Sequence, residues 1–206
     1  MHGLLFEKGY NDLIAKGYDM LPRLIAYVHD NPRRLLMRRQ RPEWLRPFFG
    51  LQLGGDTFSG IGNLGLLLAE SRKAVRVSRR VAAEEADYEE TTFLAAAQAG
   101  TVLISPAISP GEKRVMRAAF DAKLPTVVIM PNGFTPYSKP KGEQFEACAE
   151  GRLLMLSPWS HHNEKRPLTR NQCHAMNMMA LRLSTATVEE VQTAFKTLTS
   201  NMINHV

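Results

Sequence analysis

Residues 101–134 have the sequence TVLISPAISPGEKRVMRAAFDAKLPTVVIMPNGF, and this stretch decides the fold. Two short apolar runs, 102–104 and 127–130, are rich in β-branched residues and flank a helical pattern. Neither run alternates polar with apolar residues, which is typical of parallel strands covered on both faces. The stretch therefore predicts a βαβ unit, and such units hold ligands at the carboxyl ends of their strands.

The helix of this unit has a well-specified beginning. Ser109 stands at the N-cap, Pro110 at the first helical position and Glu112 three residues after the cap. This is the pattern of a capping box. An apolar stripe follows at helical spacing, formed by Val115, Met116, Ala119 and Phe120.

Similar patterns extend the unit in both directions along the chain. Residues 73–77 and 152–156 are predicted strands, and the predicted helices cover 82–99, 141–149 and 170–183. This alternation predicts an α/β fold: a Rossmann-like, doubly wound, mostly parallel sheet with flanking helices. The predicted parts are a basic helical N-terminal extension at 1–50, the Rossmann-like domain at 51–184 and a C-terminal amphipathic helix at 185–206.

The N-terminal extension carries most of the net charge of +6, because residues 1–50 hold nine Lys/Arg against five Asp/Glu. Helical spacing of apolar residues predicts a helix over 4–29, and Asp-Asn-Pro at 30–32 predicts its end. The arginines that follow, between 33 and 46, would attract phosphate backbones or form the solvated face of a helix.

A glycine-rich segment spans residues 50–65. Its Gly60-Ile61-Gly62-Asn63-Leu64-Gly65 has the spacing of a dinucleotide-binding fingerprint. We reject that interpretation because no convincing strand precedes it and no βαβ frame follows. The segment is predicted to be a connection into the strand at 73–77.

The segment 187–202 begins with a second capping box, formed by Thr187 and Glu190. Apolar residues then recur at alternating spacings of three and four, at Val188, Val191, Phe195, Leu198 and Met202. This narrow seam predicts a helix that packs on the chain's own domain or pairs with a partner, either a second copy or another protein.

Composition argues against several classes of protein. There is no apolar run of bilayer-spanning length and no signal peptide, which predicts a cytoplasmic protein without a membrane partner. Cys148 and Cys173 are expected to be isolated reduced thiols, and His161-His162 lacks the spacing of metal ligands. Without any motif for a metal, a cofactor or a catalytic constellation, we expect none of them.

Several turns match a known family in order and spacing. They are the Phe58–Leu67 lead-in with its Gly62-Asn63, the turn Ser78-Arg79, the turn at 105–112, the turn Asn132-Gly133 and the helix segment at 177–184. On these residues, 58–184 resembles the DprA/Smf DNA-processing family, part of the SLOG group of Rossmann-like nucleotide-binding domains. The resemblance implies phosphate binding at the carboxyl ends of the strands, and a role in DNA processing, uptake or recombination.

The chain departs from the family at places that matter for phosphate binding. Pro106 and Pro110 stand where the family has glycines, and proline has no N–H to donate to a phosphate. Met176 and Met178 replace two arginines of the family's helix. We expect no counterpart of the family's C-terminal winged helix, and residues 1–206 do not contain the glycine signature of the SLOG enzymes that cleave nucleotide N-glycosidic bonds.

Polar residues at the predicted strand ends are the candidates for binding a nucleotide or its phosphate. Arg79 could clamp a phosphate with two hydrogen bonds, and Gly133 could let a ligand approach the backbone or simply form a turn. Ser109 could bind phosphate at a helix N-terminus or only cap that helix. The full set is Ser78, Arg79, Ser105, Ser109, Lys113, Asn132, Gly133 and Asn177, with Arg170 and Asn171 as further polar candidates.

The hypothesis that follows is non-catalytic binding of single-stranded DNA or a nucleotide. One alternative is a SLOG-type enzyme that cleaves the N-glycosidic bond of a nucleotide, with Glu112 as acid or base. Another is a degenerate domain that binds a protein partner through residues 187–202.

Overall fold

The computed structural model describes residues 20–78, 82–164 and 166–203. The chain divides into two compact units, residues 1–40 and 41–206, and each is described by itself. In the first unit the described residues form one helix, α1 (Met20–Gln40).

Helix α1 corrects one prediction, because it continues through Pro32 where the sequence predicted a break. Proline removes one N–H from the helix and so leaves the carbonyl of Val28 without its usual donor. The carboxylate of Asp30 accepts a hydrogen bond from Arg33 Nε at 2.6 Å, which ties the two sides of the proline together. The predicted helix at 4–19 lies outside the described residues.

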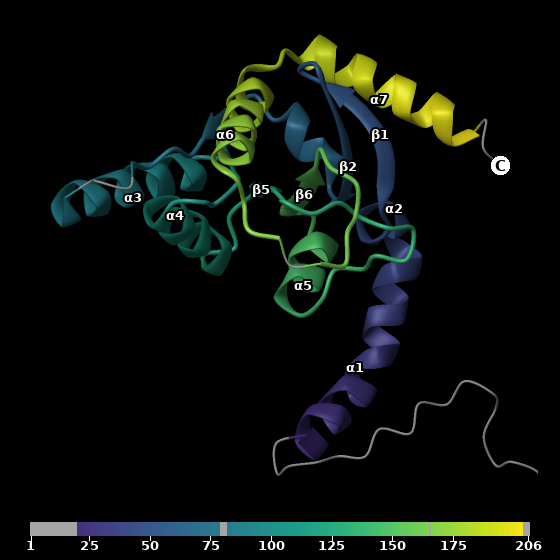
Figure 1. The fold of residues 1–206 in the computed structure, drawn as a ribbon. Helices are drawn as coiled ribbons and strands as arrows, with labels where there is room; N and C mark the ends of the chain where they lie inside the picture. The colour runs from purple at the N-terminus through teal and green to yellow at the C-terminus, as the bar shows by residue number, and fades with distance from the viewer. Residues whose placement is uncertain (1–19, 79–81, 165, 204–206) are drawn as a thin grey trace, which may run out of the picture. The chain divides into compact units, whose positions relative to one another are not determined.

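The second unit is built on a six-stranded sheet in the order β1-β2-β6-β5-β4-β3 (Figure 1). Its strands are β1 (Phe48–Leu53), β2 (Asp56–Gly62), β3 (Arg72–Ala74), β4 (Val102–Ser105), β5 (Thr126–Ile129) and β6 (Leu153–Ser157). Strands β3 to β6 are parallel, and β2 and β1 add to β6 as an antiparallel pair. The predicted Rossmann-like, mostly parallel α/β fold is thereby confirmed.

The hairpin of β1 and β2 corrects the second prediction, since residues 50–65 were expected to be a connection. Gly54 and Gly55 have φ values of +62° and +81°, which is the backbone of a tight hairpin turn. Gly60 lies inside β2, and a Cβ there would come within 2.6 Å of the carbonyl oxygen of Met155 on β6. The glycines therefore permit close strand pairing rather than irregular structure.

Helices cover both faces of the sheet. Val102 and Ile104 of β4 pack into the cluster that includes α6 (Arg170–Thr185). Leu103 of the same strand packs into the opposite cluster, with α3 (Ala83–Gln98) and α4 (Pro110–Asp121). This alternation explains the continuous apolar run of β4. The remaining helices are α2 (Pro42–Leu45), α5 (Glu143–Ala149), α7 (Val188–Ile203) and the 3-10 helix η1 (Leu64–Leu68).

Helix α7 fits the first of the two alternatives for the segment 187–202, which is packing on the chain's own domain. It packs along β1 of its own sheet, as Figure 1 shows. Val191, Ala194 and Leu198 are buried there, with at most 4% exposure. The chain's own domain thus covers Val191 and Leu198 of the predicted seam, whereas Val188 is 43% exposed. The predicted capping box is present because Thr187 and Glu190 exchange hydrogen bonds.

None of the helices within the described ranges combines the length and apolar character needed to cross a bilayer.

Candidate functional site

Two neighbouring cavities lie at the carboxyl ends of the parallel strands. The β3–β4 cavity has a volume of about 870 Å³, and its walls include Arg76, Ser78, Glu89, Glu112, Arg170 and Asn177. The β5–β6 cavity has a volume of about 750 Å³, and its walls include Asn132, Trp159, His161, His162, Glu164 and Arg166. Leu168 lines both cavities. This is the sheet edge where α/β folds bind ligands.

Two buried serines hold the backbone at the β3–β4 cavity, and of the two only Ser109 lines it. Ser105 Oγ donates to the carbonyl of Val75 at 3.2 Å, and Ser109 Oγ donates to the carbonyl of Val77 at 2.8 Å. Each hydroxyl also accepts a backbone N–H, from Ala107 at 3.1 Å and from Glu112 at 3.1 Å. Both predicted site serines are therefore engaged in holding the chain after β3 against the start of α4.

The N-terminus of α4 is occupied by a carboxylate of the protein itself. Glu112 Oε2 accepts the backbone N–H groups of Ile108 at 2.8 Å and Ser109 at 3.1 Å, which completes the predicted capping box. Glu112 is only 4% exposed. Because these amides are the donors that a phosphate would use, an anion here would meet a negative charge already in place.

The N-terminus of α6 differs, because its capping box is neutral. Thr169 and Gln172 exchange hydrogen bonds at 3.0 and 3.2 Å, and the first turn holds no acidic residue. The first helical residue is Arg170, whose charge is unfavourable beside the positive end of a helix dipole. This helix start therefore concentrates positive potential at the cavity.

Arg76 adds a second cation to the same cavity. Arg76 and Arg170 are both exposed, and within the described part of the chain neither forms an ion pair. The contrast is Arg114 on α4, which pairs with Asp87 and Glu90. Alternation could have revealed Arg76 in the sequence, since it lies between the buried Val75 and Val77.

The other predicted residues of this region fall in different places. Ser78 is exposed and lines the β3–β4 cavity, as does Asn177. Lys113 is exposed on α4 and belongs to neither cavity wall. Arg79 lies outside the described residues.

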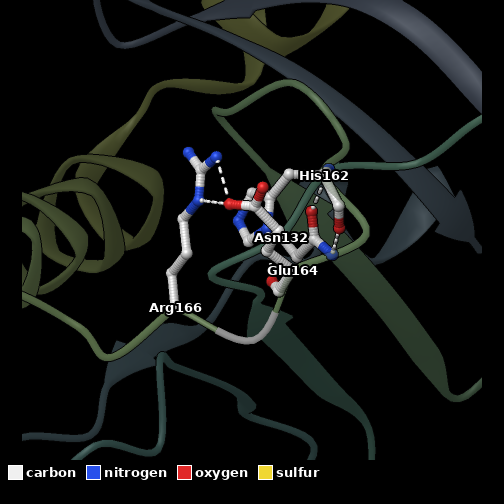
Figure 2. Close-up of polar contacts among 4 residues, drawn as sticks. All are labelled: Asn132, His162, Glu164 and Arg166. Atoms are coloured by element: carbon white, nitrogen blue, oxygen red, sulfur yellow. Dashed lines mark hydrogen bonds and ion pairs between the residues drawn. The ribbon is translucent and has the colours of Figure 1, made fainter.

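Asn132 organises the loop that walls the β5–β6 cavity. Its side-chain amide donates to the carbonyl of His162 at 2.8 Å and accepts the N–H of His162 at 2.9 Å, as Figure 2 shows. The carboxylate of Glu164 accepts two hydrogen bonds from Arg166, at 2.8 and 2.6 Å (Figure 2). Asn132 is thus used in positioning the loop.

Gly133 allows a close backbone approach, as its residue type predicted, but the partner is the loop after β6. A Cβ at Gly133 would lie 2.0 Å from the carbonyl oxygen of Trp159 and 2.8 Å from the backbone nitrogen of His161. His161 Nδ1 also lies 3.1 Å from the carbonyl oxygen of Gly133. The described residues hold no group of three or more His, Cys, Asp or Glu side chains placed to bind a metal ion.

One solved structure with a similar fold is DNA processing protein A from Helicobacter pylori. The match has a TM-score of 0.45 and 18% sequence identity, and it covers 62% of this chain and 57% of that chain. The chain thus matches little more than half the length of that protein, whose structure was described for its single-stranded DNA binding mode. No protein-family model and no curated protein matches the sequence.

The different burial of the two cysteines allows a test of whether the β3–β4 cavity is open to a small reagent. Burial raises the pKa of the Cys148 thiol to about 12, whereas Cys173 is half-buried and lines the β3–β4 cavity. Thiolates are the reactive form, so iodoacetamide at neutral pH should alkylate Cys173 in the folded protein and spare Cys148. Both should react in denaturant, and peptide mass spectrometry would identify the site. Rapid labelling of Cys148 in the folded protein would contradict the structure.

Proposed function

We propose that this chain binds single-stranded DNA or a nucleotide, without catalysing its conversion, at the β3–β4 cavity. The observation that carries the proposal is the pair of arginines, Arg76 and Arg170, that face one cavity without carboxylate partners in the described chain. Guanidinium groups bind phosphate through paired, charge-assisted hydrogen bonds. The DNA processing protein A of Helicobacter pylori binds the same class of ligand.

The phosphate position follows from the contrast between the two helix starts. At α4 the carboxylate of Glu112 already accepts two backbone N–H groups, so that end does not favour an anion. At α6 the cap is neutral and Arg170 stands in the first turn. We therefore place a phosphate between Arg76 and the start of α6, with the hydroxyl of Ser78 on the same cavity wall.

The remaining predicted contacts take supporting roles in this proposal. Ser105 and Ser109 hold the cavity wall through their hydrogen bonds to Val75 and Val77. Arg79 and Lys113 would add charge near the strand ends, and the arginines between 33 and 46 would add affinity that does not depend on sequence. A role in DNA processing, uptake or recombination is proposed from the resemblance to the DprA/Smf family alone.

The proposal is tested by fluorescence anisotropy of a short labelled oligonucleotide. Affinity should fall steeply as salt rises, because each neutralised phosphate releases counterions. Arg76→Gln and Arg170→Gln should each weaken binding by about tenfold or more and reduce the salt slope by about one. Lys196→Gln is the matched control, since Lys196 is an exposed cation on α7 and lies on neither cavity wall.

Bound oligonucleotide should also slow the alkylation of Cys173, which shares the cavity with Arg170. The proposal would be contradicted if the affinity for the oligonucleotide did not depend on salt, or if neither arginine substitution changed it.

A further inference from the structure

The β3–β4 cavity carries a second kind of group beside its arginines, namely oxygen acceptors without donors. Glu89 Oε2 on α3 and Asn177 Oδ1 on α6 are buried atoms with no hydrogen-bond partner in the part of the chain that is described. Both residues line the cavity, and they come from opposite faces of the sheet.

Glu112 supplies a third acceptor. Its Oε2 is held by two backbone N–H groups, while its Oε1 has no hydrogen-bond partner among the described residues and, unlike Glu89 Oε2 and Asn177 Oδ1, is not a fully buried atom. The side chain is 96% removed from solvent, since only 4% is exposed, and it lines the same cavity. Three elements, α3, α4 and α6, thus direct acceptor-bearing side chains to one space.

Buried acceptors need a donor, because an unpaired polar atom keeps its desolvation cost. A phosphate has only acceptor oxygens at neutral pH, and two of these three groups are carboxylates that repel it. The acceptor wall therefore binds another part of a nucleotide than the arginines do. The two candidate donors are an exocyclic amino group of a base and a sugar hydroxyl.

We infer that Glu89, Glu112 and Asn177 recognise N4, the exocyclic amino group of cytosine, while the arginines hold the adjoining phosphate. This inference rests on the proposed function. An amino group offers two hydrogens and a hydroxyl only one, so it better suits a wall with two buried unpartnered acceptors, Glu89 Oε2 and Asn177 Oδ1, and the second carboxylate oxygen of Glu112 beside them. Carboxylates accept from cytosine N4 in known base readout, and thymine has no amino group to offer.

The experiment compares labelled oligo(dC), oligo(dT) and oligo(rU) of equal length by anisotropy at one salt concentration and neutral pH. Oligo(dC) should bind about fivefold or more tightly than oligo(dT), which corresponds to one discriminating base contact. Oligo(rU), which adds a sugar hydroxyl but no amino group, should bind like oligo(dT).

Variants assign the preference to the acceptor wall. Glu89→Ala and Asn177→Leu should bring the ratio of the oligo(dC) and oligo(dT) affinities close to one, while oligo(dT) still binds. Glu84→Ala is the matched control, because Glu84 is exposed on the same helix and is not part of the cavity wall. The ratio is measured within each variant, so loss of folded protein does not imitate loss of preference.

Each outcome decides between the two proposals. Equal, salt-dependent affinity for oligo(dC) and oligo(dT) overturns the amino-group inference and leaves the proposed function standing. Tighter binding of oligo(rU) than of oligo(dT) assigns the donor to the sugar hydroxyl and also overturns the inference. No binding of any oligonucleotide overturns the proposed function, and this inference with it.

Discussion

Replacing Gly133 by alanine is expected to lower the free energy of unfolding by about 3 kcal/mol, because the new methyl group has no room. It would lie 2.0 Å from the carbonyl oxygen of Trp159 and 2.8 Å from the backbone nitrogen of His161. Both atoms belong to the backbone, so no side-chain rotation relieves the clash. The loop after β6 must move away from the turn after β5, and urea unfolding monitored by circular dichroism would measure the loss.

Gly55→Ala is the control for the cost of placing a side chain on a glycine backbone. Gly55 has a φ of +81°, and a Cβ there would meet nothing within 4 Å. Its substitution is expected to cost about 1–2 kcal/mol, the usual penalty for a left-handed backbone in an L-residue. If Gly133→Ala unfolds at the same urea concentration as Gly55→Ala, the close contact with Trp159 does not exist in solution.

The centre of the fold could be predicted from the sequence because its signals are local. The run at 102–104 and the capping box of Ser109 and Glu112 each involve a few neighbouring residues. An unalternating apolar run needs cover on both faces, and β4 has that cover in α6 on one side and α3 with α4 on the other. These signals do not depend on contacts with distant parts of the chain.

The hairpin of β1 and β2 could not be predicted from local signals, because its glycines are required by contacts with residues that are distant in the sequence. Gly60 and Gly62 weaken a strand by propensity alone. A Cβ at Gly62 would lie 2.2 Å from the carbonyl oxygen of Leu153, a residue of β6 that is far away in sequence. These glycines let β2 approach β6 closely, which is seen only once the two strands are paired. Local propensity therefore indicated a loop where the tertiary contact required a strand.

The candidate site was predictable in position but only partly in composition. Topology places ligands at the carboxyl edge, and Ser78, Ser109 and Asn177 do meet in the β3–β4 cavity. The structure adds Arg76, one residue before the predicted strand end, and Glu89, in the middle of a helix whose facing residues the sequence does not reveal. Conversely, the hydroxyl of Ser109 donates to the carbonyl of Val77 and accepts the backbone N–H of Glu112, so both of its hydrogen-bonding roles are used. The sequence does not reveal the first of these bonds, because Val77 is distant in the chain.

Arg72→Met should destabilise the second unit by about 2–4 kcal/mol, because Arg72 joins segments that are distant in sequence. Its guanidinium donates to the carbonyl of Leu67 in η1 and to the carbonyl of Ala186, the residue that ends α6. Burial lowers the pKa of Arg72, and the methionine side chain would leave both carbonyls without this donor. Hydrogen bonds to a charged group contribute about 1.5–3 kcal/mol each, and part of that is regained where water can enter.

Arg117→Met is the comparison that separates buried from exposed contacts of an arginine. Arg117 also has two charged partners, Asp121 and Glu143, besides the ring of Phe120, but the side chains of the three charged residues are all more than half exposed. Solvent screens such pairs, so this substitution should leave the urea midpoint nearly unchanged. If Arg72→Met unfolds at the same urea concentration as Arg117→Met, then Arg72 does not bind the two carbonyls in solution.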